Sequence, residues 1–117
     1  MSFKIVHADD CESAGSWRLV RRTLGVESFG INLVEIAPGE GIPEHDELAR
    51  DQEEVFYVLS GSPMLVIDGE GHPAPAGTLA RLSPEHSRTV RNEGEAPASV
   101  LIVSAPRSSG YQKMDWA

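Results

Sequence analysis

Three ionisable side chains in the middle of the chain have types and a spacing suited to holding a metal or a small molecule. His45 and Glu47 are two residues apart, so in extended backbone their side chains lie on one face. Glu54 follows and begins an apolar run that ends at Gly61. A carboxylate at that place is costly to bury unless it binds a partner. Imidazole and carboxylate groups are common ligands of divalent metals, so the stretch predicts a small polar site.

Two simpler interpretations of this stretch stay open. His45 follows Pro43 and could be an ordinary loop histidine at the surface. The acidic residues around it could form a solvated loop in which Arg50 is the counter-charge, or a lid over a cavity.

Short apolar runs separated by turn residues predict the scaffold that positions the site. We expect strands over residues 17–23, 29–36, 54–60, 64–67, 78–82, 87–91 and 98–104, and no helix. Asp68-Gly69 is a strong hairpin signal. Such strands are typical of an antiparallel sandwich or barrel. Several of them are apolar on both faces, so a second sheet or a partner subunit must cover them, and we expect a homodimer.

Length, charge and cysteine content limit the class of protein. A chain of 117 residues suits one domain, here 1–117, and the single Cys11 excludes an internal disulfide. No apolar run approaches the ~20 residues that cross a bilayer, so we expect a cytoplasmic protein. A net charge of -8 argues against binding to nucleic acid or anionic membranes. Residues 106–117 contain Tyr111 and Trp116 and are expected to form an arm pinned on the body.

Two spaced patterns resemble the motifs of the cupin superfamily, which are small β-barrels of jelly-roll type. The family's first motif, G-x5-H-x-H-x3-4-E-x6-G, resembles residues 39–61, with Glu47 at the second histidine and a longer gap before Glu54. The second motif, G-x5-P-x-G-x2-H-x3-N, resembles residues 77–92, with Arg88 at the histidine position and His86 two residues earlier. The resemblance implies an all-β, single-domain jelly-roll β-barrel.

The resemblance also implies a divalent metal site near the barrel mouth. Many cupins hold one metal through three histidines and one glutamate, whereas others have lost the metal and bind sugars, anions or effectors. Here the implied ligands are His45, Glu54 and His86, if His86 turns inward as its strand parity with Arg88 allows, and Glu47 could be a further ligand. Mn, Fe, Ni or Zn would be the metal, and an added carboxylate favours the harder ions.

Arg88 has two interpretations. It could form a salt bridge that keeps Glu54 or Glu47 ionised, or it could turn the former metal cavity into an anion site that grips a carboxylate or phosphate. Phe56 could line the pocket, although an aromatic residue on a strand is more often core.

Three functional hypotheses follow from this site. The first is a small-molecule-binding cupin whose ligand could be anionic, with the site lined by His45, Glu47, Glu54, Phe56, His86 and Arg88. The second is a metal-dependent dioxygenase or isomerase that uses His45, Glu54 and His86. The third is a vestigial site in an accessory protein.

Overall fold

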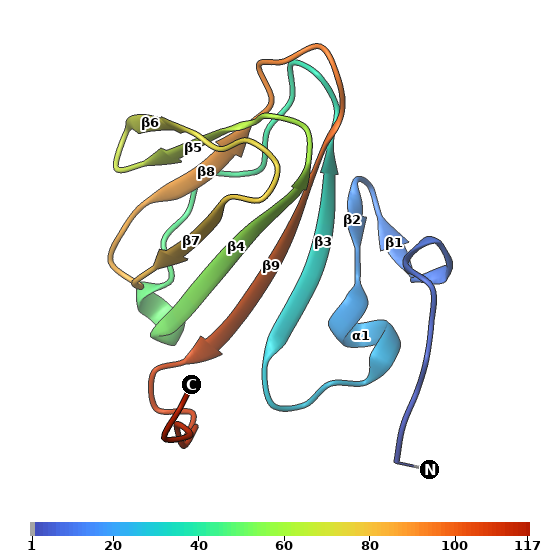
Figure 1. The fold of residues 1–117 in the computed structure, drawn as a ribbon, viewed down its shortest axis with the longest axis vertical. Coiled ribbons are helices and arrows are strands. Elements are labelled where there is room, and N and C mark those ends of the chain that lie inside the picture. Colours follow the sequence, from blue (N-terminus) through green and yellow to red (C-terminus); the bar gives the residue numbers. More distant parts are fainter. Residues whose placement is uncertain (1) are drawn as a thin grey trace.

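Two antiparallel sheets face each other and enclose the core (Figure 1). The computed structural model describes residues 2–117. The larger sheet has the strand order β1-β2-β3-β9-β4-β7 and the smaller one β6-β5-β8. The larger sheet comprises β1 (Ser13–Ala14), β2 (Trp17–Arg18), β3 (Gly30–Ile36), β4 (Gln52–Ser60), β7 (Leu79–Leu82) and β9 (Ala98–Pro106). The smaller sheet comprises β5 (Met64–Ile67), β6 (Glu70–Pro73) and β8 (Arg88–Arg91). This arrangement confirms the all-β fold.

Helices are few and short in the described part of the chain. They are the 3-10 helices η1 (Ala8–Asp10) and η2 (Leu48–Arg50) and the α-helix α1 (Val20–Leu24). No helix among residues 2–117 is long and apolar enough to cross a membrane.

One predicted strand is largely wrong. Residues 17–23 form a strand only at Trp17–Arg18, and the chain then turns into α1. Gly25 ends this helix in the left-handed region, at φ 75°, and its N–H donates to Arg21 O. Val20 and Leu24 are four residues apart and share one face of the helix, a period too short to be recognised in five residues. The remaining predicted strands match β3, β4, β5, β7, β8 and β9 to within two residues.

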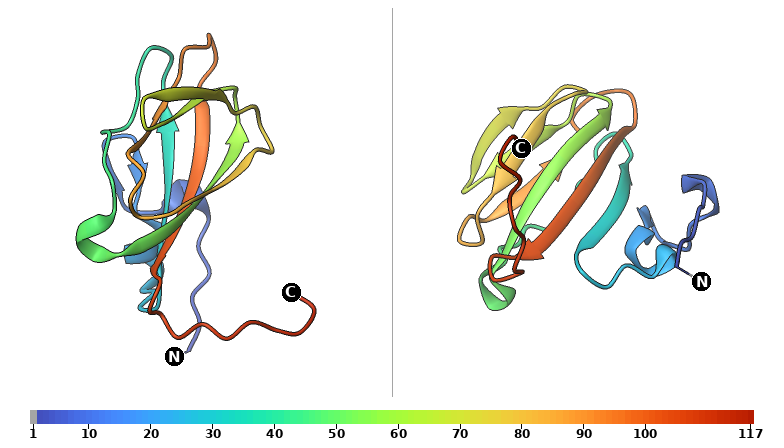
Figure 2. Two further views of the ribbon diagram at one scale, coloured as in Figure 1. Left: turned by 90° about the vertical axis from the view of Figure 1, so that its left-hand side faces the viewer. Right: turned by 60° about the horizontal axis from the view of Figure 1, so that its bottom comes forward.

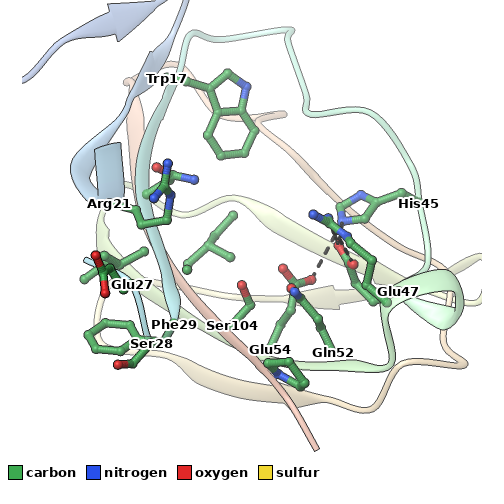
Figure 3. Close-up of a pocket in the computed structure, with 16 residues that line it drawn as sticks. Trp17, Arg21, Glu27, Ser28, Phe29, His45, Glu47, Gln52, Glu54 and Ser104 are labelled. Carbon is green, nitrogen blue, oxygen red and sulfur yellow. Dashed lines mark hydrogen bonds and ion pairs between the residues drawn. The ribbon is translucent and has the colours of Figure 1, made fainter. Parts of the chain in front are cut away.

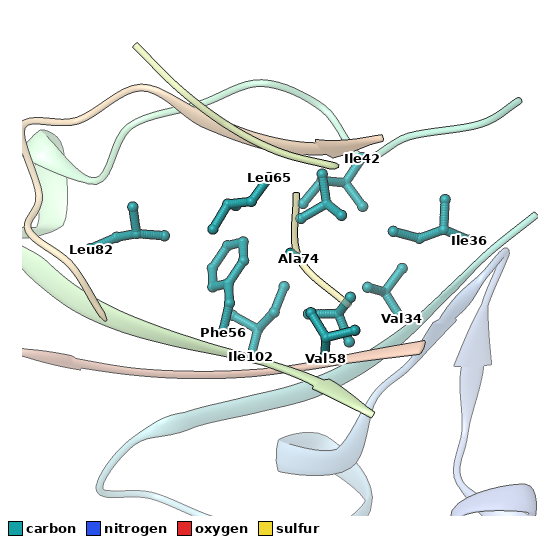
Figure 4. Close-up of a cluster of buried hydrophobic side chains, with 11 residues drawn as sticks. Val34, Ile36, Ile42, Phe56, Val58, Leu65, Ala74, Leu82 and Ile102 are labelled. Carbon is teal, nitrogen blue, oxygen red and sulfur yellow. The ribbon is translucent and has the colours of Figure 1, made fainter. Parts of the chain in front are cut away.

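The core lies between the two sheets (Figure 4). On β4 the side chains alternate, so that Glu54, Phe56 and Val58 are buried while Val55 and Tyr57 are exposed. The predicted orientation of Glu54 into the molecule is therefore confirmed. Phe56 belongs to a cluster with aliphatic residues of both sheets, which include Val34, Ile36, Leu65, Leu82, Val90, Val100 and Ile102.

The C-terminal arm extends away from the body after β9 (Figure 2). Its aromatic residues are exposed, Tyr111 by 75% and Trp116 by 84%. The expectation that they pack on the body is therefore wrong for this single chain. Near its start the arm is held by polar contacts with Asp51: Arg107 N–H donates to Asp51 O at 3.1 Å, and Arg107 Nη2 donates to Asp51 Oδ1 at 2.6 Å.

The homodimer stays a prediction. The outer face of the larger sheet carries apolar side chains that a partner could cover, namely Val55, Tyr57, Leu59 and Leu79. We expect sedimentation equilibrium at micromolar concentration to give twice the 12.7 kDa mass of one chain. Leu79→Glu on this face should shift the protein towards the monomer, whereas Leu48→Glu, exposed on η2, should not. A wild-type protein that sediments only as a monomer would contradict the prediction.

Candidate functional site

A cavity of about 550 Å³ opens beside the larger sheet (Figure 3). Its volume lies in the range of small-molecule sites. One side is polar and comes from η2, the loop before it and β4, with His45, Glu47, Arg50, Gln52 and Glu54. The opposite side comes from β2, α1, β3 and the loop before it, and includes Trp17, Arg21, Phe29 and Asn32.

His45, Glu47 and Glu54 converge on the polar side of this cavity. Each offers one ligand atom, and these atoms lie within 4.8 Å of one another. His45 Nε2 is 3.5 Å from Glu47 Oε1 and 3.7 Å from Glu54 Oε1. Both glutamates are only 6% exposed. The three residues that the sequence predicted as a polar site therefore do lie together.

The orientation of the His45 ring follows from its other nitrogen. Nδ1 lies 3.0 Å from the carbonyl oxygen of Pro43, which can only accept a hydrogen bond, so Nδ1 carries the proton. In a neutral ring the lone pair of Nε2 then points towards the two carboxylates. Lone pairs on three such atoms repel one another unless a proton or a cation lies between them. The cluster is thus built to hold a positive charge.

Backbone pairing places His45 on this wall. His45 N–H donates to Arg88 O at 3.0 Å and Arg88 N–H donates to His45 O at 2.8 Å, so the loop runs antiparallel to β8. The longer gap before Glu54 is accommodated by η2 and by Asp51, which has a left-handed φ of 50°. The chain therefore re-enters β4 with Glu54 still facing the cavity.

Arg88 lies behind Glu54 and is fully buried. Its Nη1 donates to Glu54 Oε1 at 3.1 Å and its Nη2 donates to Ser83 O at 2.6 Å. Its Nε has no hydrogen-bond partner among residues 2–117. Of the two interpretations of Arg88, the salt bridge to Glu54 is the one with the observed contacts. The guanidinium does not line the cavity, so it is not placed to grip a ligand.

Burial raises the pKa of the Glu54 carboxyl above its usual value. The charge of Glu47 raises this pKa further, while Arg88 and then His45 act in the opposite direction. Glu54 can therefore carry a proton at a pH where an exposed glutamate has lost it.

Besides Arg88, two further predicted site residues lie outside the lining of the cavity. His86 was expected on the inner face by strand parity with Arg88, but it lies in the turn before β8, where strand parity does not apply. Its Nδ1 is 2.7 Å from Asp68 Oδ2, and it is not one of the clustered ligands. The hydrogen bond with His86, and then the one from the Ser87 N–H, lower the pKa of the Asp68 carboxyl. Phe56 is 2% exposed in the core and does not line the cavity.

Sequence reasoning missed the opposite wall. Trp17 and Arg21 line the cavity, Trp17 from β2 and Arg21 from α1, the helix that the patterns did not predict. Asn32 could have been found from the sequence, because side chains alternate along β3 and Asn32 lies on the same face as the buried Val34 and Ile36. A polar residue at an otherwise apolar inner position is often a site residue.

The donor set fits a divalent cation. Donor atoms held about 2.1 Å from a metal with tetrahedral angles are about 3.4 Å apart, close to the two distances at His45 Nε2. One imidazole and two carboxylates favour hard or borderline ions such as Mn²⁺, Fe²⁺ or Zn²⁺. The hydrogen bond from Arg88 leaves Glu54 further lone pairs for a ligand bond.

The sequence identifies the class of protein to which this fold of two facing sheets with a polar cluster at a cavity belongs. The profile of the cupin domain matches residues 32–104, so the chain belongs to the cupin family. The comparison with curated proteins gave no significant match.

Solved cupin structures share this fold. A cupin protein from Bacteroides fragilis is similar over 97% of this chain and 92% of its own, with a TM-score of 0.82 and 19% identity. A sugar phosphate isomerase from a cupin superfamily, from Silicibacter pomeroyi, has a TM-score of 0.67 and 26% identity over 78% of this chain and 60% of its own. A predicted oxalate decarboxylase from Thermotoga maritima has a TM-score of 0.61 and 21% identity, over 66% of this chain and 65% of its own.

Proposed function

We propose that this chain is a small-molecule-binding cupin whose cavity holds a divalent cation on His45, Glu47 and Glu54. The convergence of their three ligand atoms within 4.8 Å, at the wall of a cavity of about 550 Å³, carries the proposal. The cavity leaves room for a small polar molecule beside the cation.

Each residue of the cluster has a distinct task in this proposal. The hydrogen bond to Pro43 O fixes the His45 ring so that Nε2 faces the cation. Glu47 and Glu54 supply negative charge. A bound divalent cation would act as a Lewis acid on an oxygen atom of the ligand.

An enzymatic form of this function is an isomerase-type reaction. The similarity to a sugar phosphate isomerase at 26% identity favours it. In that form Glu47 takes the place that the sequence analysis gave to His86.

Metal analysis of protein purified without a histidine tag tests the proposal. We expect about one Mn²⁺, Fe²⁺ or Zn²⁺ per chain after equilibration and gel filtration. His45→Ala should weaken binding by more than the roughly 10–100-fold that loss of an outer-shell partner costs. His72→Ala, on the exposed strand β6, is the matched control and should retain the cation.

His86→Ala separates this ligand set from the one implied by the family resemblance. Since His86 pairs with Asp68 outside the cluster, the variant should keep the cation. Loss of the cation in His86→Ala, or a wild-type protein that binds none of the three metals, would refute the proposal. A protein whose thermal stability also responds to no small molecule would match the vestigial hypothesis.

A further inference from the structure

Arg21 differs from the other two arginines close to the cavity. Arg50 Nη2 is 3.3 Å from Glu47 Oε2, and Arg88 Nη1 is 3.1 Å from Glu54 Oε1. Arg21 forms no ion pair in the described part of the chain, and its Nη1 donates only to Val26 O at 3.2 Å. Its charge is therefore available to a ligand.

Arg21 lies across the cavity from His45, Glu47 and Glu54. It projects from α1 on the wall opposite His45 and Glu47, and the cavity lies between them (Figure 3). Trp17 and Phe29 line the same side, and their rings offer an apolar surface next to the guanidinium. A ligand that contacts both walls would meet the guanidinium of Arg21 at one end and the acidic cluster at the other.

With a divalent cation bound at the cluster, the charge of the cavity would favour an anion. The carboxylates that line it, Glu27, Glu47 and Glu54, are matched in number by the guanidiniums of Arg21, Arg50 and, behind the wall, Arg88. A divalent cation on the cluster would leave a net positive charge. Glu27 makes no ion pair with Arg21, so it does not neutralise this group directly.

We infer that Arg21 binds the phosphate or carboxylate of a small polar ligand whose other end lies at His45, Glu47 and Glu54. A guanidinium can hold either oxyanion by two parallel hydrogen bonds. Gln52 on the polar wall and Asn32 on the opposite wall also line the cavity and can bond to hydroxyl groups of the ligand. The ligand class deepens the proposed function and rests on it for the role of the cluster.

Calorimetric titration of the Mn²⁺-equilibrated protein with three matched compounds tests the inference. Glucose 6-phosphate, glucuronate and glucose share a six-carbon pyranose skeleton and differ in the group at carbon 6, which is a phosphate, a carboxylate or a neutral hydroxymethyl group. We expect at least one anion to bind more tightly than glucose, and the tighter of the two identifies phosphate or carboxylate as the group bound. Arg21→Gln should weaken that anion about ten- to a hundredfold and leave glucose unchanged.

Arg22→Gln is the matched control, because Arg22 follows on the same helix, pairs with Glu12 at 3.4 Å and does not line the cavity. It should bind like the wild type, and Arg21→Lys should restore part of the affinity. Circular dichroism of each variant checks the fold. Equal binding of all three compounds, no binding by the wild type, or no effect of Arg21→Gln would overturn the inference.

The same titration in EDTA distinguishes the two claims. If anion binding depends on Arg21 but needs no metal, the role of Arg21 is supported and the role of the cation is refuted. If the protein binds one metal per chain but anion affinity does not depend on Arg21, the cation site is supported and the anion subsite is refuted.

Discussion

Replacing Arg88 with methionine is expected to lower the free energy of unfolding by about 3–5 kcal/mol. The variant removes the guanidinium 3.1 Å from Glu54 and leaves a carboxylate that is 6% exposed without its counter-charge. Ser83 O also loses the hydrogen bond that Arg88 donates. Urea denaturation of the metal-free protein, followed by circular dichroism, measures the loss.

A second variant separates loss of the charge pair from loss of packing. Arg88→Met with Glu54→Leu removes both charges, and the stability should recover towards that of the wild type, because a buried ion pair adds little over apolar residues of similar size. Arg107→Met is the surface control, since its pair with Asp51 is largely exposed, and should have a much smaller effect. A double variant as unstable as Arg88→Met, or an Arg88→Met no worse than Arg107→Met, would contradict this account.

Gly61→Ala is expected to cost about 2–4 kcal/mol of stability, by adding backbone strain to a steric clash. Gly61 has a φ of 80°, which disfavours any other residue. An added Cβ would lie 2.7 Å from Pro97 O and 2.8 Å from Ala98 Cα. These atoms belong to backbone just before β9 and at its first residue, which cannot move without disturbing the pairing of β9 with β3 and β4.

Gly39→Ala is the matched control for Gly61→Ala. Gly39 has nearly the same φ, 83°, but among residues 2–117 no atom lies within 4 Å of an added Cβ. The free energy of unfolding of Gly39→Ala should fall only by the cost of backbone strain at positive φ, about 1 kcal/mol. Thermal and urea unfolding compare the two variants. Equal losses would show that the close approach to β9 is unimportant.

Local patterns predicted the acidic side of the site because the alternation of side chains along a strand determines which way Glu54 faces. Glu54 shares a face with Phe56 and Val58 on β4, and His45 and Glu47 are brought to it by pairing with β8 and by η2. The salt bridge of Arg88 to Glu54 was one of two interpretations, and only the fold could choose between them. The family, predicted from two spaced motifs, is confirmed by the domain match over residues 32–104.

The errors arise where contacts distant in sequence decide the outcome. His86 is two residues before Arg88, yet β8 begins only at Arg88, where the pairing with β5 starts. Whether a residue lies in a strand or in the preceding turn depends on that partner strand. Arg21 was missed for a related reason, since a five-residue helix has too few turns to show a period.

The buried guanidinium of Arg88 also affects whether the protein needs a bound metal in order to fold. A zinc finger is unfolded without its metal, because the free energy of metal binding supplies its free energy of folding. Here Arg88 Nη1 lies 3.1 Å from Glu54 Oε1, so the chain supplies its own counter-charge for this buried carboxylate and needs no cation for that purpose. Folding would therefore not require the proposed cation, and we expect a chelator to remove that cation without unfolding the protein.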